Sequence, residues 1–375
     1  MRFSQYLPDL VPHDAISDHA RRLHEVLVGA GHDSSIHAAH VDHRLRREAQ
    51  RWSAGSAAPE GVAIYHASTG SPLAGWLRGH AAAGTRLVVD YHNVTPARYF
   101  ERWDSAAAAR CRAGRAELAS LATCAVAGVA DSEFNEAELL DAGYPTTATC
   151  PLLVDLDSFR GPGDPEDPQV LRRRATRIAG AGDARSSAPE PPEPPGSSWL
   201  FVGRLAPNKC QHDLVAAFAV YRRLHDPAAR LELVGSTSSI LYRRALGDLC
   251  AELGVDDAVS FVGSATHAEL LARFRSAGVL VCLSEHEGFC VPLLEAMVVG
   301  TPVVAFAAAA VPETLAGAGV LLDDKDPLVV AEAVAELMAD RQRRERLVEA
   351  GRQRASTFEM CLTAKRWLRE LELLG

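Results

Sequence analysis

The chain has 375 residues, of which 47% are hydrophobic and 23% charged, a composition typical of a globular protein large enough for two domains. Its net charge of -9 argues against a general nucleic-acid binder, and it has no uninterrupted apolar stretch of about 18 residues that would predict a membrane-spanning helix. The N-terminus lacks the apolar core of a signal peptide, so we expect a cytoplasmic protein, with peripheral contact to a membrane as an alternative.

The first 160 residues alternate predicted strands with predicted helices. Strands are expected at 2–7, 34–39, 61–65, 86–91 and 125–130, and helices at 15–29 and 104–122. Such alternation predicts a parallel, doubly wound sheet. We therefore expect residues 1–160 to form one Rossmann-like domain.

Residues 161–198 interrupt this alternation. They hold eight of the 21 prolines, including the run APEPPEPP, and cannot bury enough apolar surface to fold. We predict a disordered, partly polyproline linker, within which a short basic helix near 169–178 is possible.

The alternation then restarts. Strands are expected at 199–205, 230–234, 259–262, 279–283, 302–306 and 320–322, and helices at 210–224, 239–253, 267–276, 291–299 and, as one long helix, 326–350. We expect a second Rossmann-like domain over 199–358 and a final helix within 359–375 that packs back on the first domain. Two such domains leave a central cleft between facing strand ends, where ligands bind in folds of this kind.

The most informative segment is Ser284–Met297, with the sequence SEHEGFCVPLLEAM. A buried strand ends here, and a helix follows with Pro292 in its first turn and Gly300 past its end. The N-terminus of that helix offers unpaired N–H groups to an anion such as a phosphate. Two carboxylates, Glu287 and Glu295, flank this position. They suit a ligand with hydroxyl groups on both sides of its phosphates, namely a nucleotide sugar.

A second polar loop follows the strand that opens the second half. Its sequence is FVGRLAPNK, in which Gly203 permits close backbone approach and Arg204 and Lys209 bring two cations. An ordinary surface loop is the alternative. Because both loops lie at the carboxyl ends of parallel strands, they should open on the same edge of the sheet.

With these two loops, the second half resembles the donor domain of retaining glycosyltransferases of family 4, which have the two-domain GT-B fold. The resemblance covers about residues 199–358, and Glu287 and Glu295 match the family's E-x7-E signature. It implies that Arg204 and Lys209 hold the donor diphosphate, that Glu287 meets the sugar hydroxyls and that Glu295 holds the ribose. The donor-binding set it implies is Gly203, Arg204, Lys209, Glu287, Gly288, Phe289, Cys290, Val291 and Glu295. Cys210 and Cys290 stand where relatives often carry glycine.

The first half is a looser match. The strand before His92 and Asn93 resembles the family's strand that ends in an active-site histidine, which makes His92 a candidate to touch both sugar and acceptor. His66 is a weaker candidate for the same cleft, and Asn93 is a further acceptor-side candidate. Asp14 either contacts the acceptor or simply caps the first helix. The family often has a glycine pair in this N-terminal loop, which this chain lacks.

The resemblance predicts a retaining transfer of a sugar from a nucleoside-diphosphate sugar to a hydroxyl of a glycan, glycolipid or small molecule. Its catalytic set is His92, Glu287, Arg204 and Lys209. No cofactor is expected, and the absence of an Asp-rich motif or of metal-type cysteine spacing predicts metal-independent transfer. A sugar-nucleotide epimerase of the same architecture and a catalytically silent nucleotide-sugar-binding subunit are the alternatives.

Overall fold

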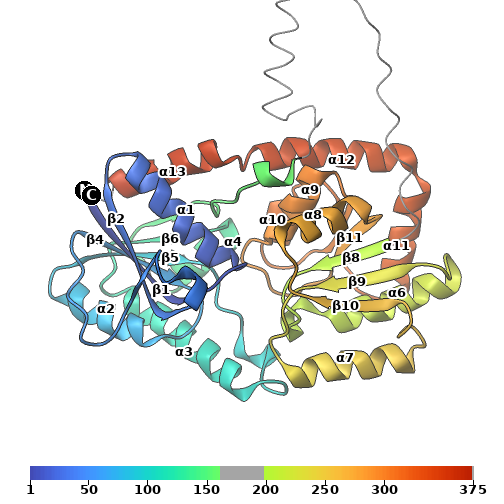
Figure 1. Ribbon diagram of the computed structural model, residues 1–375, viewed down its shortest axis with the longest axis horizontal. Helices are drawn as coiled ribbons and strands as arrows, with labels where there is room; N and C mark the ends of the chain where they lie inside the picture. Colours follow the sequence, from blue (N-terminus) through green and yellow to red (C-terminus); the bar gives the residue numbers. More distant parts are fainter. Residues whose placement is uncertain (161–197, 374–375) are drawn as a thin grey trace, which may run out of the picture.

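The computed structural model describes residues 1–160 and 198–373, so the predicted linker lies outside the described residues apart from Ser198. Two α/β halves lie side by side, and each has a parallel sheet between layers of helices (Figure 1). The predicted pair of doubly wound, Rossmann-like domains is confirmed.

The N-terminal sheet has seven parallel strands in the order β3-β2-β1-β4-β5-β6-β7. Its strands are β1 (Arg2–Leu10), β2 (Asp33–Val41), β3 (Gln50–Arg51), β4 (Val62–Ala67), β5 (Arg86–Tyr91), β6 (Ala127–Ala130) and β7 (Thr147–Thr149). Its helices are α1 (Ala15–Gly29), α2 (Pro72–Ala82), α3 (Ser105–Leu121) and α4 (Glu133–Asp141). All six residues of β4 are buried, as expected for a central parallel strand covered on both faces.

The C-terminal sheet has six parallel strands in the order β10-β9-β8-β11-β12-β13. Its strands are β8 (Ser198–Val202), β9 (Arg230–Val234), β10 (Val259–Gly263), β11 (Val279–Cys282), β12 (Val303–Phe306) and β13 (Val320–Leu322). Its helices are α6 (Gln211–Leu224), α7 (Ile240–Glu252), α8 (His267–Ser276), α9 (Val291–Val299), α10 (Val311–Leu315), α11 (Pro327–Ala339) and α12 (Arg341–Ser356).

The strand orders fix where a ligand can enter. In the N-terminal sheet the order reverses between β1 and β4, and in the C-terminal sheet between β8 and β11. Ligands of open α/β sheets bind at such reversals, beyond the carboxyl ends of the strands. The loops after β8 and β11 are the two polar loops that the sequence singled out.

The prediction of a single helix over 326–350 is wrong, because the helix is interrupted at Asp340. This residue has extended geometry, with ψ 92°, and its carboxylate accepts a 2.8 Å hydrogen bond from the Arg343 amide. The acid thus caps a new helix, α12, where the pattern of apolar residues alone suggested continuity.

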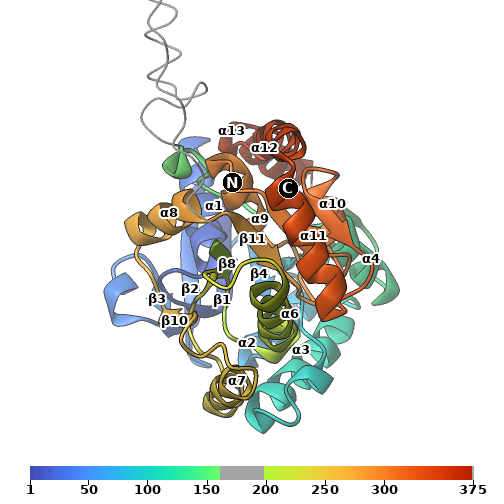
Figure 2. The same cartoon turned by 90° about the vertical axis from the view of Figure 1, so that its right-hand side faces the viewer.

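The last helix, α13 (Met360–Leu373), returns to the N-terminal domain. Trp367 is fully buried there in a cluster with Phe3 and Leu23, and its indole N–H donates to the Pro151 carbonyl at 2.9 Å. In both views α12 and α13 run along one side of the molecule, with α13 over the N-terminal half (Figure 1 and Figure 2).

Candidate active site

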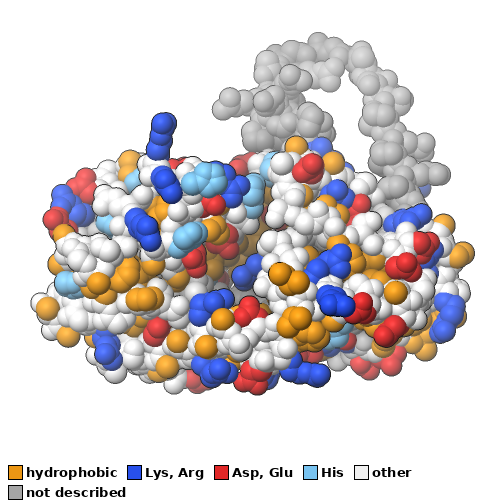
Figure 3. Space-filling model, turned by 60° about the horizontal axis from the view of Figure 1, so that its bottom comes forward, with side chains coloured by type: hydrophobic (Ala, Val, Ile, Leu, Met, Phe, Trp, Pro, Cys, Tyr) orange, Lys and Arg blue, Asp and Glu red, His pale blue; other side chains and the backbone are white. Residues whose placement is uncertain are grey.

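The candidate site is the groove between the two halves, where the molecule is visibly hollowed and basic side chains stand near the opening (Figure 3). Its C-terminal wall is the donor loop, by which we mean residues 284–290 between β11 and α9. Gly288 of this loop packs directly against the N-terminal domain. A Cβ atom there would lie 2.8 Å from the Cβ of Asn93 and 3.1 Å from the His92 carbonyl, so only glycine fits.

The second half of the donor loop contacts protein through its carbonyls and leaves its amides free, whereas the Glu285 amide in the first half donates to the Asn208 carbonyl at 3.0 Å. The Glu287 carbonyl accepts from the Ala310 amide at 3.2 Å. The carbonyls of Gly288 and Phe289 accept from the hydroxyls of Ser132 and Thr314 at 2.7 and 2.6 Å. The amides of residues 288–291, in contrast, donate to no other group in the described part of the chain. At the start of α9 these N–H groups form a site for an anion.

The cationic loop after β8 faces the donor loop. Lys209 Nζ lies 2.5 Å from Glu287 Oε2, so the cation and the carboxylate that the resemblance assigns to phosphate and sugar are in direct contact. Arg204 is exposed, and the Gly203 that precedes it has φ 150°, a backbone geometry that favours glycine. The structure therefore brings together Gly203, Arg204, Lys209 and Glu287 at one strand-end edge.

Glu295 projects from α9 on the side facing α1, where Arg22 and Asp18 lie near it. Burial raises the pKa of Glu295 to about 7 against the opposing charge of Arg22, with a smaller contribution in the same direction from Asp18. Its carboxylate has no hydrogen-bond partner within residues 1–160 and 198–373. An unpaired acceptor in this position suits the two hydroxyl donors of a ribose.

Both cysteines that stand where relatives often have glycine adopt left-handed backbone geometry. Cys210 has φ 52° and immediately precedes α6, and Cys290 has φ 70° and immediately precedes α9. Non-glycine residues are uncommon in this region, so both positions keep the backbone shape of a glycine while carrying a side chain.

On the acceptor side, Asp14 takes the capping role. Its carboxylate accepts from the amide and the hydroxyl of Ser17 at 3.0 and 2.9 Å, with extended backbone at φ −121°. The side chain is half-buried at the start of α1, so any contact with an acceptor would be in addition to the cap.

The structure places His92 behind the surface of the cleft. Its imidazole is 1% exposed; Nδ1 lies 3.1 Å from both oxygens of Asp131, and Nε2 lies 2.9 Å from His66 Nδ1 and 3.2 Å from Asp90 Oδ2. These carboxylates raise the pKa of His92 well above its usual value against the opposing effect of burial. Contact of His92 and the equally buried His66 with sugar or acceptor stays a prediction.

Asn93 is the residue of this strand end that reaches the cleft. It has φ 74°, and its Oδ1 accepts from His286 Nε2 of the donor loop at 2.6 Å. Burial lowers the pKa of His286 to about 4, which leaves the ring neutral near neutral pH. Asn93 Nδ2 donates to Asn135 at 2.8 Å, so one amide side chain joins both domains.

Sequence reasoning missed several residues of this region: Asp90, Asp131, Ser132, Asn135 and His286. Four of the five stand at or just beyond strand ends: Asp90 in β5, Asp131 and Ser132 after β6, and His286 after β11. The sequence signal that could have identified these four residues was therefore their position: each is a polar residue at or just beyond the carboxyl end of an apolar strand.

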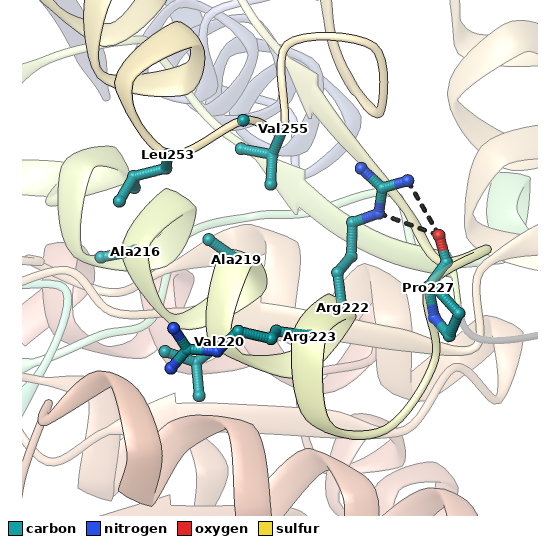
Figure 4. Close-up of a pocket in the computed structure, with 9 residues that line it drawn as sticks. Ala216, Ala219, Val220, Arg222, Arg223, Pro227, Leu253 and Val255 are labelled. Atoms are coloured by element: carbon teal, nitrogen blue, oxygen red, sulfur yellow. Dashed lines mark hydrogen bonds between the residues drawn. The ribbon is translucent and has the colours of Figure 1, made fainter.

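A cavity of about 380 Å³ lies elsewhere, beneath the second half of α6 and beside residues 253–255 (Figure 4). Arg222 there donates to the Pro227 carbonyl at 3.2 and 2.8 Å. α6 begins beside Lys209 at the cleft and runs back along the sheet, so this cavity is at the opposite edge and is separate from the candidate site.

Two Rossmann-like domains whose strand ends face each other across a phosphate-type loop define the GT-B fold. Solved structures agree: Anabaena HepE in complex with UDP has a TM-score of 0.74 at 16% identity, covering 99% of this chain and all of that one. A sucrose-phosphate synthase from Thermosynechococcus elongatus has the same TM-score at 21% identity, covering 100% and 99% of the two chains.

Sequence comparisons extend this result. Residues 189–354 match the family model of glycosyl transferases group 1. A D-inositol 3-phosphate glycosyltransferase from Frankia alni is 33% identical over 264 residues, which are 68% of this chain and 60% of the relative. One from Salinispora arenicola is 35% identical over 214 residues, 55% of this chain and 44% of the relative. The chain thus spans about half the length of these relatives. Together the comparisons support a glycosyltransferase family for the chain.

Within the described residues, no helix is both long and apolar enough to cross a membrane.

Proposed function

We propose that the protein is a retaining glycosyltransferase of family 4 that transfers a sugar from a nucleoside-diphosphate sugar to an acceptor hydroxyl. The observation that carries this proposal is the donor loop, in which three successive carbonyls are held by the protein while the amides of residues 288–291 stay free. Such a row of amides at a helix start, facing Lys209, is suited to a diphosphate.

Charge distribution supports the assignment of roles. Departure of the nucleoside diphosphate places negative charge on its leaving oxygen, which fixed cations and amides stabilise as it develops. Arg204, Lys209 and the loop amides supply that stabilisation. Glu287 would accept from sugar hydroxyls, and Glu295 from the ribose.

The contact between Lys209 and Glu287 fits this division of roles. In the free protein the two groups neutralise each other at 2.5 Å. A bound donor would separate them, giving the ammonium to phosphate and the carboxylate to the sugar. We propose that transfer needs no metal at the diphosphate and follows a front-face route in which the departing phosphate accepts the acceptor's proton.

The structurally similar proteins suggest which nucleotide the donor carries. HepE structures are described as complexes with UDP and with UDP-glucose. A UDP-sugar is therefore the first donor to test, and UDP-, GDP- and ADP-sugars should be compared by thermal shift, because a ligand bound only by the folded state raises the unfolding temperature. Peripheral membrane contact and a cytoplasmic location stay predictions.

Lys209→Ala and Glu287→Ala should each lower turnover at least tenfold, about 1.4 kcal/mol of barrier, because each removes a group facing the reacting centre. Lys365→Ala, in α13, is the matched control and should keep wild-type turnover. Steady-state kinetics on variants of unchanged melting temperature make the comparison, and wild-type rates for both cleft variants would contradict the proposal.

Product analysis separates the alternatives. An epimerase would release nucleotide and an altered sugar without an acceptor, and a silent subunit would bind the donor by calorimetry with no turnover.

A further inference from the structure

A cluster of titratable side chains lies inside the N-terminal domain, next to the cleft but not exposed to it. His19, His66 and Asp90 have fully buried side chains, and that of His92 is 1% exposed. Three imidazole nitrogens lie within 3.2 Å of one carboxylate oxygen, Asp90 Oδ2, while its other oxygen is buried with no partner among the described residues.

The outer hydrogen bonds of the rings decide where their protons lie. His92 Nδ1 donates to Asp131, and His66 Nε2 faces Gln5 Oε1 at 2.9 Å. In neutral rings these bonds leave lone pairs on His92 Nε2 and His66 Nδ1. The two lone pairs point at each other across 2.9 Å, with Asp90 Oδ2 at 3.2 and 3.0 Å. With these tautomers the facing lone pairs repel each other, and a cation between the three atoms would relieve that repulsion.

His19 plays a different part. The Leu153 amide donates to His19 Nδ1 at 3.0 Å, which places the proton of the neutral ring on Nε2. That N–H donates to Asp90 Oδ2 at 3.1 Å. His19 therefore holds the carboxylate in place rather than offering a third lone pair.

The spacing of the three facing atoms suits a metal ion. A tetrahedral zinc ion with bonds of 2.0–2.2 Å separates its ligand atoms by about 3.3–3.5 Å. The observed separations of 2.9, 3.0 and 3.2 Å need to open by only a few tenths of an ångström. The contact of Asp131 with the outer nitrogen of His92 is the carboxylate–histidine support that metal-bound imidazoles commonly have.

The charges also favour a divalent ion over a shared proton. In the ion pairs of the described residues, Asp90 and Asp131 meet only histidines, never lysine or arginine. One imidazolium would leave a net negative charge in a buried cluster, whereas a divalent cation balances both carboxylates.

We propose that His66 Nδ1, His92 Nε2 and Asp90 bind one divalent transition-metal ion, zinc by the nature of its ligands, with Asp131, Gln5 and His19 orienting them. This goes beyond the proposed glycosyl transfer, because the ion lies inside the N-terminal domain and not at the donor diphosphate. It departs from the expectation, drawn from sequence spacing, that the chain holds no metal.

The ion would have a structural effect on the cleft. Asn93 follows His92 directly and binds His286, and Ser132 follows Asp131 directly and binds Gly288. Fixing His92 and Asp131 therefore fixes both backbone segments against which the donor loop closes.

The full chain, purified without chelator or affinity metal, should contain close to one zinc per molecule by plasma mass spectrometry. Asp90→Asn and His66→Gln should lower that content at least tenfold. His40→Gln is the matched control, because His40 also lies near an aspartate, Asp9, at 3.5 Å, but on the surface. It should keep the wild-type content.

Two further measurements do not depend on the variants. Stripping the wild type with a chelator should lower its melting temperature by several degrees, and zinc alone should restore it. Cobalt(II) added to the stripped protein should give the visible absorption of a site with nitrogen and oxygen ligands.

Gln5→Glu checks the proton assignment. A carboxylate can only accept, so it fixes the tautomer of His66 that leaves Nδ1 free, and metal content should be retained. Wild-type protein that is folded and metal-free, and that neither gains stability nor binds when zinc is added, would overturn the proposal in favour of a shared proton.

Discussion

Cys290 shows how a residue can serve through its backbone alone. Its φ of 70° turns the chain from the donor loop into α9, and its side chain is buried with its sulfur 3.8 Å from that of Cys282. A cysteine tolerates this geometry because it is small and unbranched at Cβ. A β-branched residue would meet much greater strain.

Cys290→Val should therefore destabilise the protein by about 1–3 kcal/mol, whereas Cys290→Gly should keep turnover within about threefold. Cys111→Val is the control, because Cys111 is also buried but lies within helix α3, and its cost should be smaller. Urea unfolding measures the free energies. Equal losses for both valine variants would show that side-chain volume, not backbone geometry, decides the effect.

Glu295 should make donor binding depend on pH. Its pKa is raised to about 7, so the carboxyl is partly protonated near neutrality and its ionised form accepts from the ribose better. Donor affinity should rise up to about tenfold between pH 6 and 8 in the wild type. Glu295→Gln should bind more weakly at pH 8 and lose most of this dependence, as measured by calorimetry.

The raised pKa of Glu295 also makes the stability of the folded protein depend on pH. The folded-state pKa of Glu295 is above its ordinary value of 4.5, so its contribution is fully present below pH 4.5 and is lost as the pH rises through 7. Glu295→Gln should therefore be more stable than the wild type at pH 8 and similar at pH 4.5. A variant less stable at pH 8 would show that Glu295 has a stabilising partner.

Among single residues, charged side chains in a distinct loop at a helix start could be predicted as site residues. Burial and contacts that depend on partners far away in the sequence could not be predicted. Glu287 and Lys209 stood out because loop, helix start and charge coincide, and they prove to touch. His92 was recognised by its place at a strand end. Its burial was not predictable, because Asp131 lies 39 residues further along and meets it only once β5 and β6 are paired.

At the scale of elements, helix caps also join the two domains. Ser132 caps α4, accepting from the Asn135 amide at 3.2 Å, and the same hydroxyl donates across the cleft to the Gly288 carbonyl at 2.7 Å. Ser239 likewise caps α7 and donates to the Trp103 carbonyl at 2.9 Å. Each hydroxyl thus ties a helix start to the opposite domain.

Ser132→Ala should cost about 1 kcal/mol of stability as a lost cap and should also lower turnover, because the donor loop loses a hydrogen bond that orients its amides. Ser71→Ala is the matched control. Ser71 caps α2 within one domain, accepting from the Leu73 amide at 3.4 Å, so it should lose stability but not turnover. Equal turnover in the two variants would assign the hydroxyl of Ser132 to folding alone.

The elements themselves were largely predictable, because buried parallel strands are continuous apolar runs with clear ends. The sequence analysis did not predict β3, β7, α2, α4, α10 or the helix break at Asp340. Two of these exceptions have a clear local cause. The strand β7 has only three residues, all half-buried, and so leaves little pattern. The break at Asp340 depends on one capping carboxylate, whose preference competes with a helical pattern on both sides.

At the scale of the whole molecule, the chain crosses between the domains more than once. It passes from the first domain to the second and then returns through α12 and α13 (Figure 1). Arg160, near the end of the first domain, donates to Glu359, just before α13, at 3.0 Å. The sequence predicts this return, but an amphipathic helix shows only that it packs, and the structure identifies the residues that α13 contacts.

Substitution of Trp367 tests how much the packing of α13 stabilises the N-terminal domain. The indole is fully buried against Phe3 and Leu23, lies 5.0 Å from the ring of His19, and donates to the Pro151 carbonyl. Trp367→Ala should cost about 3–5 kcal/mol, because it leaves a large cavity and an unpaired carbonyl. Leu362→Ala, on an exposed face of the same helix, should cost far less.

The part of the molecule that loses stability in Trp367→Ala is as informative as the total loss of unfolding free energy. Because α13 covers the sheet of the N-terminal domain, hydrogen exchange in Trp367→Ala should accelerate in β1 and α1 while β8 and β11 keep their protection. Uniform acceleration in both sheets would mean that the two domains unfold as one cooperative unit. The helix would then join the domains rather than stabilise one of them.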